Sequence, residues 1–215
     1  MKRIGVGVIG WGFMGRTHTH SLRAIPLFYQ GLDFEPVLAG VCSRRLEKAK
    51  EAQEQLGFGF ATDDYHALLA REDIQVVSIC TPNAMHEQMA IDAMRAGKHV
   101  YLDKPVAVTA EAAERMLRVQ RENGVKCQVV LNNRFFPSTM RAHQLIEEGR
   151  LGEILSFTCR YLHSGSVDPN RAMGWKQGLE GGVLLDMGSH APDLLTWRLG
   201  LPAAVPFPHP PPSPN

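Results

Sequence analysis

A run of glycines near the amino terminus has a spacing that can hold phosphate groups. It reads Gly10-Trp11-Gly12-Phe13-Met14-Gly15, follows the apolar run Ile4–Ile9, and opens a stretch with helical spacing. Glycines placed there allow a tight turn and a close approach of the backbone to a pyrophosphate. A glycine-rich turn that binds nothing is the alternative, but the strand and helix patterns that follow favour dinucleotide binding. The residues predicted to hold the cofactor are Gly10, Gly12, Phe13, Met14 and Gly15.

The end of the second apolar run, Val37–Cys42, indicates which dinucleotide to expect. NAD sites usually carry Asp or Glu there for the ribose hydroxyls, whereas this chain continues with Ser43, Arg44 and Arg45. A hydroxyl followed by guanidinium groups suits a 2′-phosphate. We therefore predict NADP, with NAD as the alternative cofactor. The two arginines could instead form the solvated first turn of the next helix.

Lys104 is placed for proton transfer. It follows the apolar run His99–Leu102 and precedes Pro105, which favours an extended conformation at the carboxyl end of a strand. Doubly wound sheets bind their ligands at that edge, so a lysine there can exchange a proton with a substrate hydroxyl beside a nicotinamide. An ordinary surface lysine at a strand end is the alternative.

Asp186 and His190 form a second candidate pair. They are four residues apart, so in a helix they share one face and can reach one substrate. Histidine exchanges protons near neutral pH, and a carboxylate can orient it or bind a sugar hydroxyl. A helix-capping Asp and a core His are the alternative. No metal is expected, because the other histidines supply no recognisable ligand set.

Five apolar runs of strand length must position these residues. The runs are continuously apolar and are mostly followed by stretches of helical spacing, which predicts an α/β fold with a doubly wound parallel sheet. The strands are expected at Ile4–Ile9, Val37–Cys42, Val76–Cys80, His99–Leu102 and Val125–Leu131. The helices are expected at Met14–Ala24, Arg45–Leu56, Tyr65–Ala70, Ala84–Ala96 and Ala110–Asn123.

The pattern changes after Asn132, which predicts a second domain. An amphipathic helix is expected around Thr139–Glu148, a strand at Ile154–His163, and a helical stretch at Ser189–Leu199 after a Gly-rich loop. We therefore expect a dinucleotide-binding domain at 1–131 and an incomplete α+β substrate domain at 132–200. Residues 201–215 are rich in proline and predict an irregular tail.

Composition excludes several classes of partner. The 215 residues include 23 basic and 22 acidic ones, with no block of like charge, so neither nucleic acid nor an anionic membrane is an expected partner. No apolar run approaches the roughly 18 residues that span a bilayer, which predicts a cytoplasmic protein. The four cysteines form no C-x-x-C pair and are expected to be reduced and structural.

Three further segments, together with the glycine run, resemble the Gfo/Idh/MocA oxidoreductases, the family of glucose-fructose oxidoreductase and inositol dehydrogenase. The segments are Thr81-Pro82-Asn83-Ala84-Met85-His86, Asp103-Lys104-Pro105 and Gly181-Gly182-Val183-Leu184-Leu185-Asp186-Met187-Gly188-Ser189-His190. The resemblance extends from Ile4 to about Gly200. It implies an N-terminal Rossmann domain and a much longer second domain than this chain holds.

The resemblance also implies roles for individual residues. Lys104 would be catalytic, and Asp186 and His190 would line the substrate pocket. Asp103 stands where the family usually has Glu. Thr81, Pro82, Asn83 and His86 would lie beside the nicotinamide ribose, Asn133 and Arg134 at the hinge into the second domain, and Trp175 and Lys176 along the substrate. His18 and His20 are interpreted as ordinary helix residues.

The function that the resemblance implies is NAD(P)-dependent hydride transfer to or from a polyol, cyclitol or sugar-like secondary alcohol. One alternative is an NAD-dependent glycosidase of the same family, in which the hydride returns within one cycle. Another is an inactive dinucleotide-binding fragment or regulatory subunit. The expected partners are a small sugar or polyol and, for the full-length protein, further copies of itself.

Overall fold

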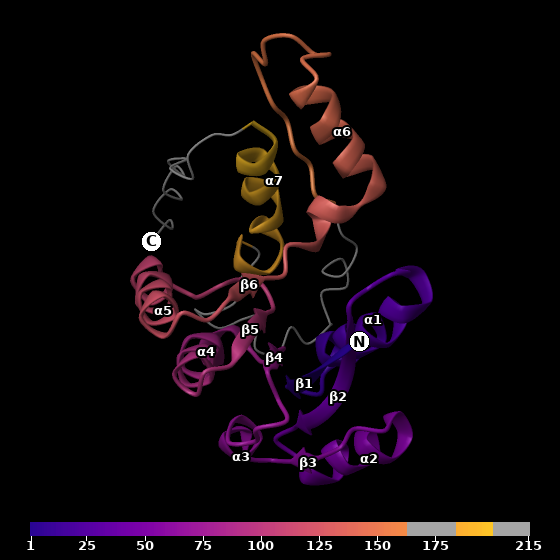
Figure 1. The fold of residues 1–215 in the computed structure, drawn as a ribbon. Coiled ribbons are helices and arrows are strands. Elements are labelled where there is room, and N and C mark those ends of the chain that lie inside the picture. Colours follow the sequence, from indigo (N-terminus) through magenta and orange to yellow (C-terminus); the bar gives the residue numbers. More distant parts are fainter. Residues whose placement is uncertain (163–183, 200–215) are drawn as a thin grey trace, which may run out of the picture. The chain divides into compact units, whose positions relative to one another are not determined.

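The structure is a computed structural model of the 215-residue chain and describes residues 1–162 and 184–199. The described chain forms two compact units. The first is Met1–Val130, and the second begins at Leu131. The first unit carries the sheet (Figure 1).

Six parallel strands form the sheet of the first unit, in the order β3-β2-β1-β4-β5-β6. Because β1 lies between β2 and β4, the chain crosses to the other half of the sheet after β3. The switch point therefore falls at the carboxyl ends of β1 and β4, where sheets of this type bind ligands. The strands are β1 (Lys2–Ile9), β2 (Phe34–Cys42), β3 (Ala61–Thr62), β4 (Val76–Ile79), β5 (His99–Leu102) and β6 (Cys127–Val129).

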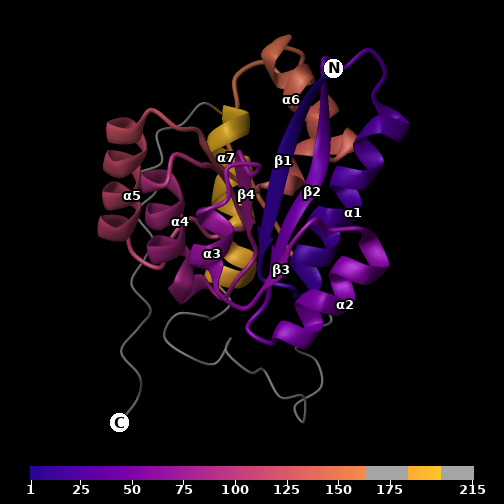
Figure 2. The same cartoon turned by 60° about the horizontal axis from the view of Figure 1, so that its bottom comes forward.

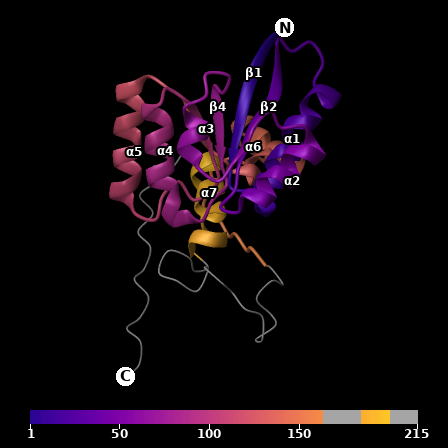
Figure 3. The same cartoon turned by 90° about the horizontal axis from the view of Figure 1, so that it is seen from below.

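Helices cover both faces of this sheet, which confirms the doubly wound fold. Helices α1 and α2 lie on one face, and α3, α4 and α5 lie on the other (Figures 2 and 3). Their bounds are α1 (Phe13–Phe28), α2 (Leu46–Leu56), α3 (Tyr65–Leu69), α4 (His86–Arg95) and α5 (Ala110–Asn123), with a short 3₁₀ helix η1 (Asn83–Met85) before α4.

Most predicted elements of this unit are confirmed, with differences mainly at their ends. Strand β2 begins at Phe34 instead of Val37, and the predicted start of α4 is the separate helix η1. Helix α1 continues past the predicted Ala24 to Phe28 with Pro26 inside it, and the N–H of its C-cap residue Tyr29 donates to the carbonyl oxygen of Ile25. The edge strand β6 is shorter than the predicted Val125–Leu131. Strand β3 was not predicted, since two residues give no periodicity.

The core lies on both sides of the sheet. The layer that includes α3, α4 and α5 contains the fully buried Leu68, Ile79 and Leu102. The layer that includes α2 is smaller and contains Val8 and Val41. The central strands β1 and β4 are thus buried on both faces, as continuous apolar runs require, whereas β5 buries only Val100 and Leu102, on one face, and leaves Tyr101 40% exposed.

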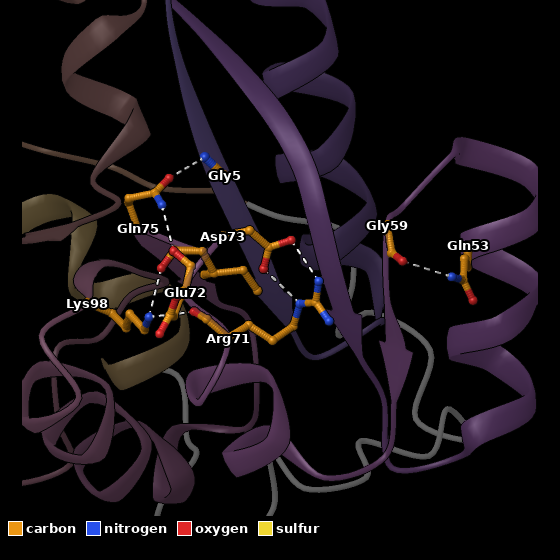
Figure 4. Close-up of polar contacts among 9 residues, drawn as sticks. Gly5, Gln53, Gly59, Arg71, Glu72, Asp73, Gln75 and Lys98 are labelled. Carbon is orange, nitrogen blue, oxygen red and sulfur yellow. Dashed lines mark hydrogen bonds and ion pairs between the residues drawn. The ribbon is translucent and has the colours of Figure 1, made fainter.

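At the amino-terminal ends of the strands, side chains form hydrogen bonds with backbone groups of neighbouring segments (Figure 4). Oε1 of Gln75 accepts from the N–H of Gly5 at 2.7 Å. Nζ of Lys98 donates to the carbonyl oxygens of Arg71 at 2.7 Å and Ile74 at 2.9 Å. These contacts fix the turn before β4 to β1 and to the start of β5.

Lys98→Met should destabilise this unit without affecting ligand binding at the opposite edge. The variant leaves two carbonyl groups without their charged donor, so the free energy of unfolding should fall by about 1.5–3 kcal/mol. Urea denaturation measures the change. The control is Lys50→Met, which removes the same charge from an exposed position on α2. Equal stability of Lys98→Met and the wild type would contradict this account of the edge.

The second unit contains helices close to those predicted, and its described residues do not form the predicted strand. Its described elements are η2 (Asn132–Phe135), α6 (Pro137–Glu147), a π-helical turn η5 (Leu184–Gly188) and α7 (His190–Leu199).

The prediction of a strand at Ile154–His163 is wrong over residues 154–162, which form no strand. His163 lies outside the described residues. Leu155 and Leu162 are 87% and 89% exposed. A strand needs a neighbour for its N–H and carbonyl groups, and no described segment of this unit pairs with residues 154–162. The Gly-rich loop 178–182 and residues 201–215 also lie outside the described part. Over the described residues, every helix is too short or too polar to cross a bilayer.

Candidate functional site

Gly10 makes the turn that leaves β1. Its φ is +99°, in the left-handed region that favours glycine, and a Cβ there would lie 2.6 Å from the carbonyl oxygen of Cys80. Its N–H donates to the carbonyl oxygen of Cys42 at 2.9 Å. The turn is therefore held between the ends of β2 and β4, and only glycine fits.

Gly15 and Gly12 serve different purposes. A Cβ on Gly15 would lie 2.0 Å from the carbonyl oxygen of Gly10, so α1 packs directly on the turn. A Cβ on Gly12 would meet no described atom within 4 Å. Packing therefore requires glycine at position 15, whereas Gly12 borders open space.

The amino terminus of α1 fits a phosphate group. Gly12 is the N-cap and supplies no side-chain hydrogen bond, and the first turn has no acidic residue. The first N–H groups of the helix therefore face the open space without a competing side chain, and the helix dipole favours an anion there. Phe13 is 82% exposed at the start of the helix, and Met14 is half-buried. The residues present thus fit the pyrophosphate of a dinucleotide.

Trp11 lies in the sequence between Gly10 and Gly12, the first two glycines of this loop. Its ring meets Phe58 edge to face with 5.6 Å between ring centroids. The guanidinium carbon of Arg16 lies 5.9 Å from the centre of the Trp11 ring. The indole is thus packed beside the loop by two neighbours from different elements.

The end of β2 carries the residues predicted to select the cofactor. Ser43 is half-buried, and Arg44 and Arg45 are exposed. No acid follows β2 directly, but β3 places Asp63 and Asp64 close enough to act on Cys42: burial raises the pKa of that thiol to about 12, and the two carboxylates contribute to the rise. The sequence analysis missed these acids because it did not predict β3.

The loop after β4 contains the segment expected beside the nicotinamide ribose. Thr81 is half-buried, Pro82 is exposed and Asn83 is buried. Oγ1 of Thr81 is buried and has no hydrogen-bond partner among the described residues. His86 is fully buried, and both of its ring nitrogens contact backbone carbonyl groups. Its side chain therefore lies beneath the loop and not on its surface.

Asp103 and Lys104 follow β5 at the same edge of the sheet. Asp103 is buried, and its Oδ1 accepts from the N–H of Lys104 at 2.9 Å. Lys104 is half-buried, and the peptide bond to Pro105 is cis. The buried carboxylate thus orients the backbone that carries the candidate catalytic lysine.

His18 is a buried residue that the sequence analysis interpreted as an ordinary helix residue. Its Nδ1 lies 2.7 Å from Oγ of Ser78 and 3.2 Å from Sγ of Cys80. Burial lowers the pKa of His18 and raises the pKa of Cys80 to about 12, so both groups are neutral near neutral pH. His18 joins α1 to the end of β4. Its position three residues after Gly15, on the face that packs toward the sheet, is the signal that could have identified it.

The second unit holds a separate group of candidate residues. Asn133 is buried, and the guanidinium group of Arg134 pairs with the carboxylate of Asp193, with Nε 2.9 Å and 3.0 Å from the two oxygens. These hydrogen bonds raise the pKa of Arg134. Its guanidinium carbon also lies 5.8 Å from the centre of the Trp197 ring. Arg134 thus holds α7 against η2 within this unit.

His190 is the first residue of that helix. It is buried, and its ring stacks on Tyr161 with 5.9 Å between centroids. The backbone of Asp186 lies in the π-helical turn just before the helix. Trp175 and Lys176 lie outside the described residues.

The structure therefore brings the glycine loop, Thr81 and Lys104 to one edge of one sheet. Arg134 and His190 belong to the second unit.

Two family models match the chain. The model for the oxidoreductase family with an NAD-binding Rossmann fold covers residues 4–131. The model for the GFO/IDH/MocA C-terminal domain covers residues 139–206. The two matches are consecutive and do not overlap.

Relatives of this chain include sugar and polyol dehydrogenases. Levoglucosan dehydrogenase of Pseudarthrobacter phenanthrenivorans is 36% identical over 208 residues, which are 95% of this chain and 53% of the relative. D-glucoside 3-dehydrogenase of Escherichia coli is 34% identical over 166 residues, or 77% of this chain and 47% of the relative. Myo-inositol 2-dehydrogenase of Thermotoga maritima is 26% identical over 197 residues, or 91% of this chain and 54% of the relative.

Solved structures agree with these matches. Levoglucosan dehydrogenase in complex with NADH and levoglucosan superposes with a TM-score of 0.87 and 35% identity, covering 91% of this chain and 54% of that one. This chain thus spans about half the length of its relatives. The glycine loop, the sheet order and these matches show that the chain belongs to the Gfo/Idh/MocA family of oxidoreductases.

Proposed function

We propose that this chain takes part in hydride transfer between a nicotinamide dinucleotide and a secondary alcohol of a polyol, cyclitol or sugar. The observation that carries the proposal is the open amino terminus of α1 at the same sheet edge as Lys104. The activities of levoglucosan dehydrogenase, D-glucoside 3-dehydrogenase and myo-inositol 2-dehydrogenase support the substrate class.

Each candidate residue has a role in this reaction. The first turn of α1 holds the pyrophosphate, and the bound cofactor supplies the carbon that accepts or returns the hydride. Lys104 takes the proton of the substrate hydroxyl as the carbonyl forms. Asp186 and His190 bind the hydroxyl groups of the substrate and place the reacting carbon.

Turnover over a panel of sugars and polyols tests the proposal. Net reduction of the cofactor with at least one member of the panel is the expected result. Glycoside cleavage without net reduction would favour the glycosidase alternative. Dinucleotide binding without turnover on any member would favour a binding fragment or regulatory subunit.

We also propose a preference for NADP(H) over NAD(H). It rests on Ser43, Arg44 and Arg45, since one charge-assisted pair with a 2′-phosphate is worth roughly 1.5–3 kcal/mol, or about tenfold to a hundredfold in affinity. Calorimetric titration with NADPH and NADH measures the difference.

Asp63 and Asp64, which directly follow β3, make this a demanding test, because a carboxylate repels a 2′-phosphate. Replacing Arg44 and Arg45 together by methionine should remove the preference. Arg118→Met, at an exposed position on α5, should leave it unchanged. Equal affinities in the wild type, or tighter binding of NADH, would contradict the preference.

The proposal includes a cytoplasmic location and self-association of the full-length protein. The four cysteines, Cys42, Cys80, Cys127 and Cys159, are free thiols, as a reducing compartment maintains. Cell fractionation and sedimentation of the full-length protein test the two points separately.

A further inference from the structure

His86 connects two loops that leave the sheet side by side. It is the first residue of α4, and its side chain is 0% exposed. Nε2 lies 3.0 Å from the carbonyl oxygen of Thr81, and Nδ1 lies 2.8 Å from the carbonyl oxygen of Pro105. Thr81 follows β4 and Pro105 follows β5, and these strands are hydrogen-bonded neighbours. One side chain therefore spans the carboxyl ends of two adjacent strands.

The imidazole ring acts as a rigid spacer between the two loops. Carbonyl oxygens only accept hydrogen bonds, so a ring nitrogen that carries a proton donates to the carbonyl group it faces, and one without a proton only contacts it. A neutral ring donates to one carbonyl, and a doubly protonated ring donates to both. The ring is planar and stiff, so the donor atoms hold the carbonyl groups at a defined separation.

The contact with Pro105 fixes the carbonyl group of the residue that follows Lys104. Pro105 is the next residue in the chain, and on the other side the Asp103 carboxylate accepts from the N–H of Lys104 at 2.9 Å. The main chain of Lys104 is therefore anchored from both directions. Thr81, at the other end of the spacer, opens the segment expected beside the nicotinamide ribose.

We propose that His86 is a positioning residue for the nicotinamide half of the site. It sets the separation between the Thr81 loop and the Lys104 loop, and it acts through their backbones because its own side chain is fully buried. The inference rests on the proposed cofactor binding. The proposed role of His86 differs from that of the glycine loop, which holds the phosphates in the proposed site.

Calorimetric titration with two ligands tests the proposal. ADP reports on the half of the site formed by the glycine loop, and NADH reports on both halves. His86→Leu should weaken NADH binding by about tenfold while ADP affinity stays within about twofold, because a hydrogen bond of this kind is worth about one order of magnitude. His86→Gln keeps an amide donor and should restore part of the loss.

Two control variants distinguish positioning from loss of stability. His66→Leu makes the same chemical change at an exposed histidine on α3. Lys98→Met destabilises the same unit from the opposite edge of the sheet. Both should keep the wild-type ratio of NADH to ADP affinity, whereas His86→Leu should lower that ratio. If His86→Leu weakens both ligands equally, the residue is merely structural and the proposal is wrong.

Amide hydrogen exchange supplies a second readout that needs no ligand. The Lys104 amide should exchange about tenfold faster in His86→Leu than in the wild type, whereas the amide of Val100 inside β5 should be unaffected. If the leucine variant does not fold, the glutamine variant decides by the same two measurements. A wild-type chain that binds neither ligand would contradict the proposed function. A wild-type chain that binds NADH, with variants that keep its affinity ratio and exchange rates, would contradict only the role of His86.

Discussion

Lys104→Met is expected to lower turnover by about 10²–10⁴-fold, the usual contribution of a positioned proton transfer. Hydride removal from a secondary alcohol requires the hydroxyl proton to leave as the carbonyl forms, and methionine has no basic group to take it. Cofactor affinity should stay nearly unchanged, because in the proposed site the glycine loop and the first turn of α1 hold the phosphates. Steady-state kinetics of the full-length protein measures the loss of turnover, and cofactor titration measures the affinity.

His190→Ala provides the comparison for this prediction. If His190 positions the substrate, the variant should mainly raise KM, and if it accepts the proton, its kcat should fall as far as that of Lys104→Met. Lys126→Met, an exposed lysine just before β6, serves as the control for charge. A near-normal kcat of Lys104→Met at every pH would remove Lys104 from the mechanism.

The second large effect concerns two glycines of the same loop. Gly12→Ala should lower dinucleotide affinity by about 100-fold, because its methyl group occupies the space that a pyrophosphate needs against the helix terminus. The free energy of unfolding should change by no more than about 1 kcal/mol, since a Cβ on Gly12 meets no described atom within 4 Å. Gly15→Ala should behave differently and cost about 3 kcal/mol of stability as well, because its Cβ would lie 2.0 Å from a backbone oxygen.

Calorimetric titration and urea denaturation of both variants test this separation. Gly31→Ala is the converse control: its φ of +73° makes alanine unfavourable, so stability should fall while dinucleotide affinity is kept. Wild-type affinity in Gly12→Ala would show that the open space is not the phosphate site.

The parts of the fold that the sequence predicted are those with local signals at both ends. Helix α5 matches its predicted range because Thr109 caps its start, with Oγ1 accepting from the N–H of Ala112 at 3.2 Å, and Gly124 ends it with a positive φ. Strand β1 was found because residues 5–9 are buried whichever face they point to and are therefore apolar, whereas β5 buries only Val100 and Leu102, on one face. The glycine loop was found because its spacing follows from the turn and the packing that it must allow.

The parts that the sequence did not predict depend on partners distant along the chain. Strand β3 exists because two residues pair with β2, and nothing local marks them. Residues 154–162 have the composition of a strand without a described partner. The buried contacts of His18 and His86 were missed for the same reason, since histidines on helices give no sign of which carbonyl or hydroxyl group they will meet.

Trp11 gives this loop a built-in optical probe. Its indole lies between Gly10 and Gly12 and is fixed by Phe58 and Arg16, so its surroundings change when a dinucleotide occupies the turn. Indole emission overlaps the absorption band of a reduced nicotinamide, so reduced cofactor should quench this tryptophan by energy transfer, whereas oxidised cofactor lacks that band. The emission lost in Trp11→Phe is the part that comes from Trp11, and the emission that remains comes from Trp175 and Trp197. Occupancy and redox state of the cofactor can thus be followed in real time by ultraviolet excitation, without attaching a dye.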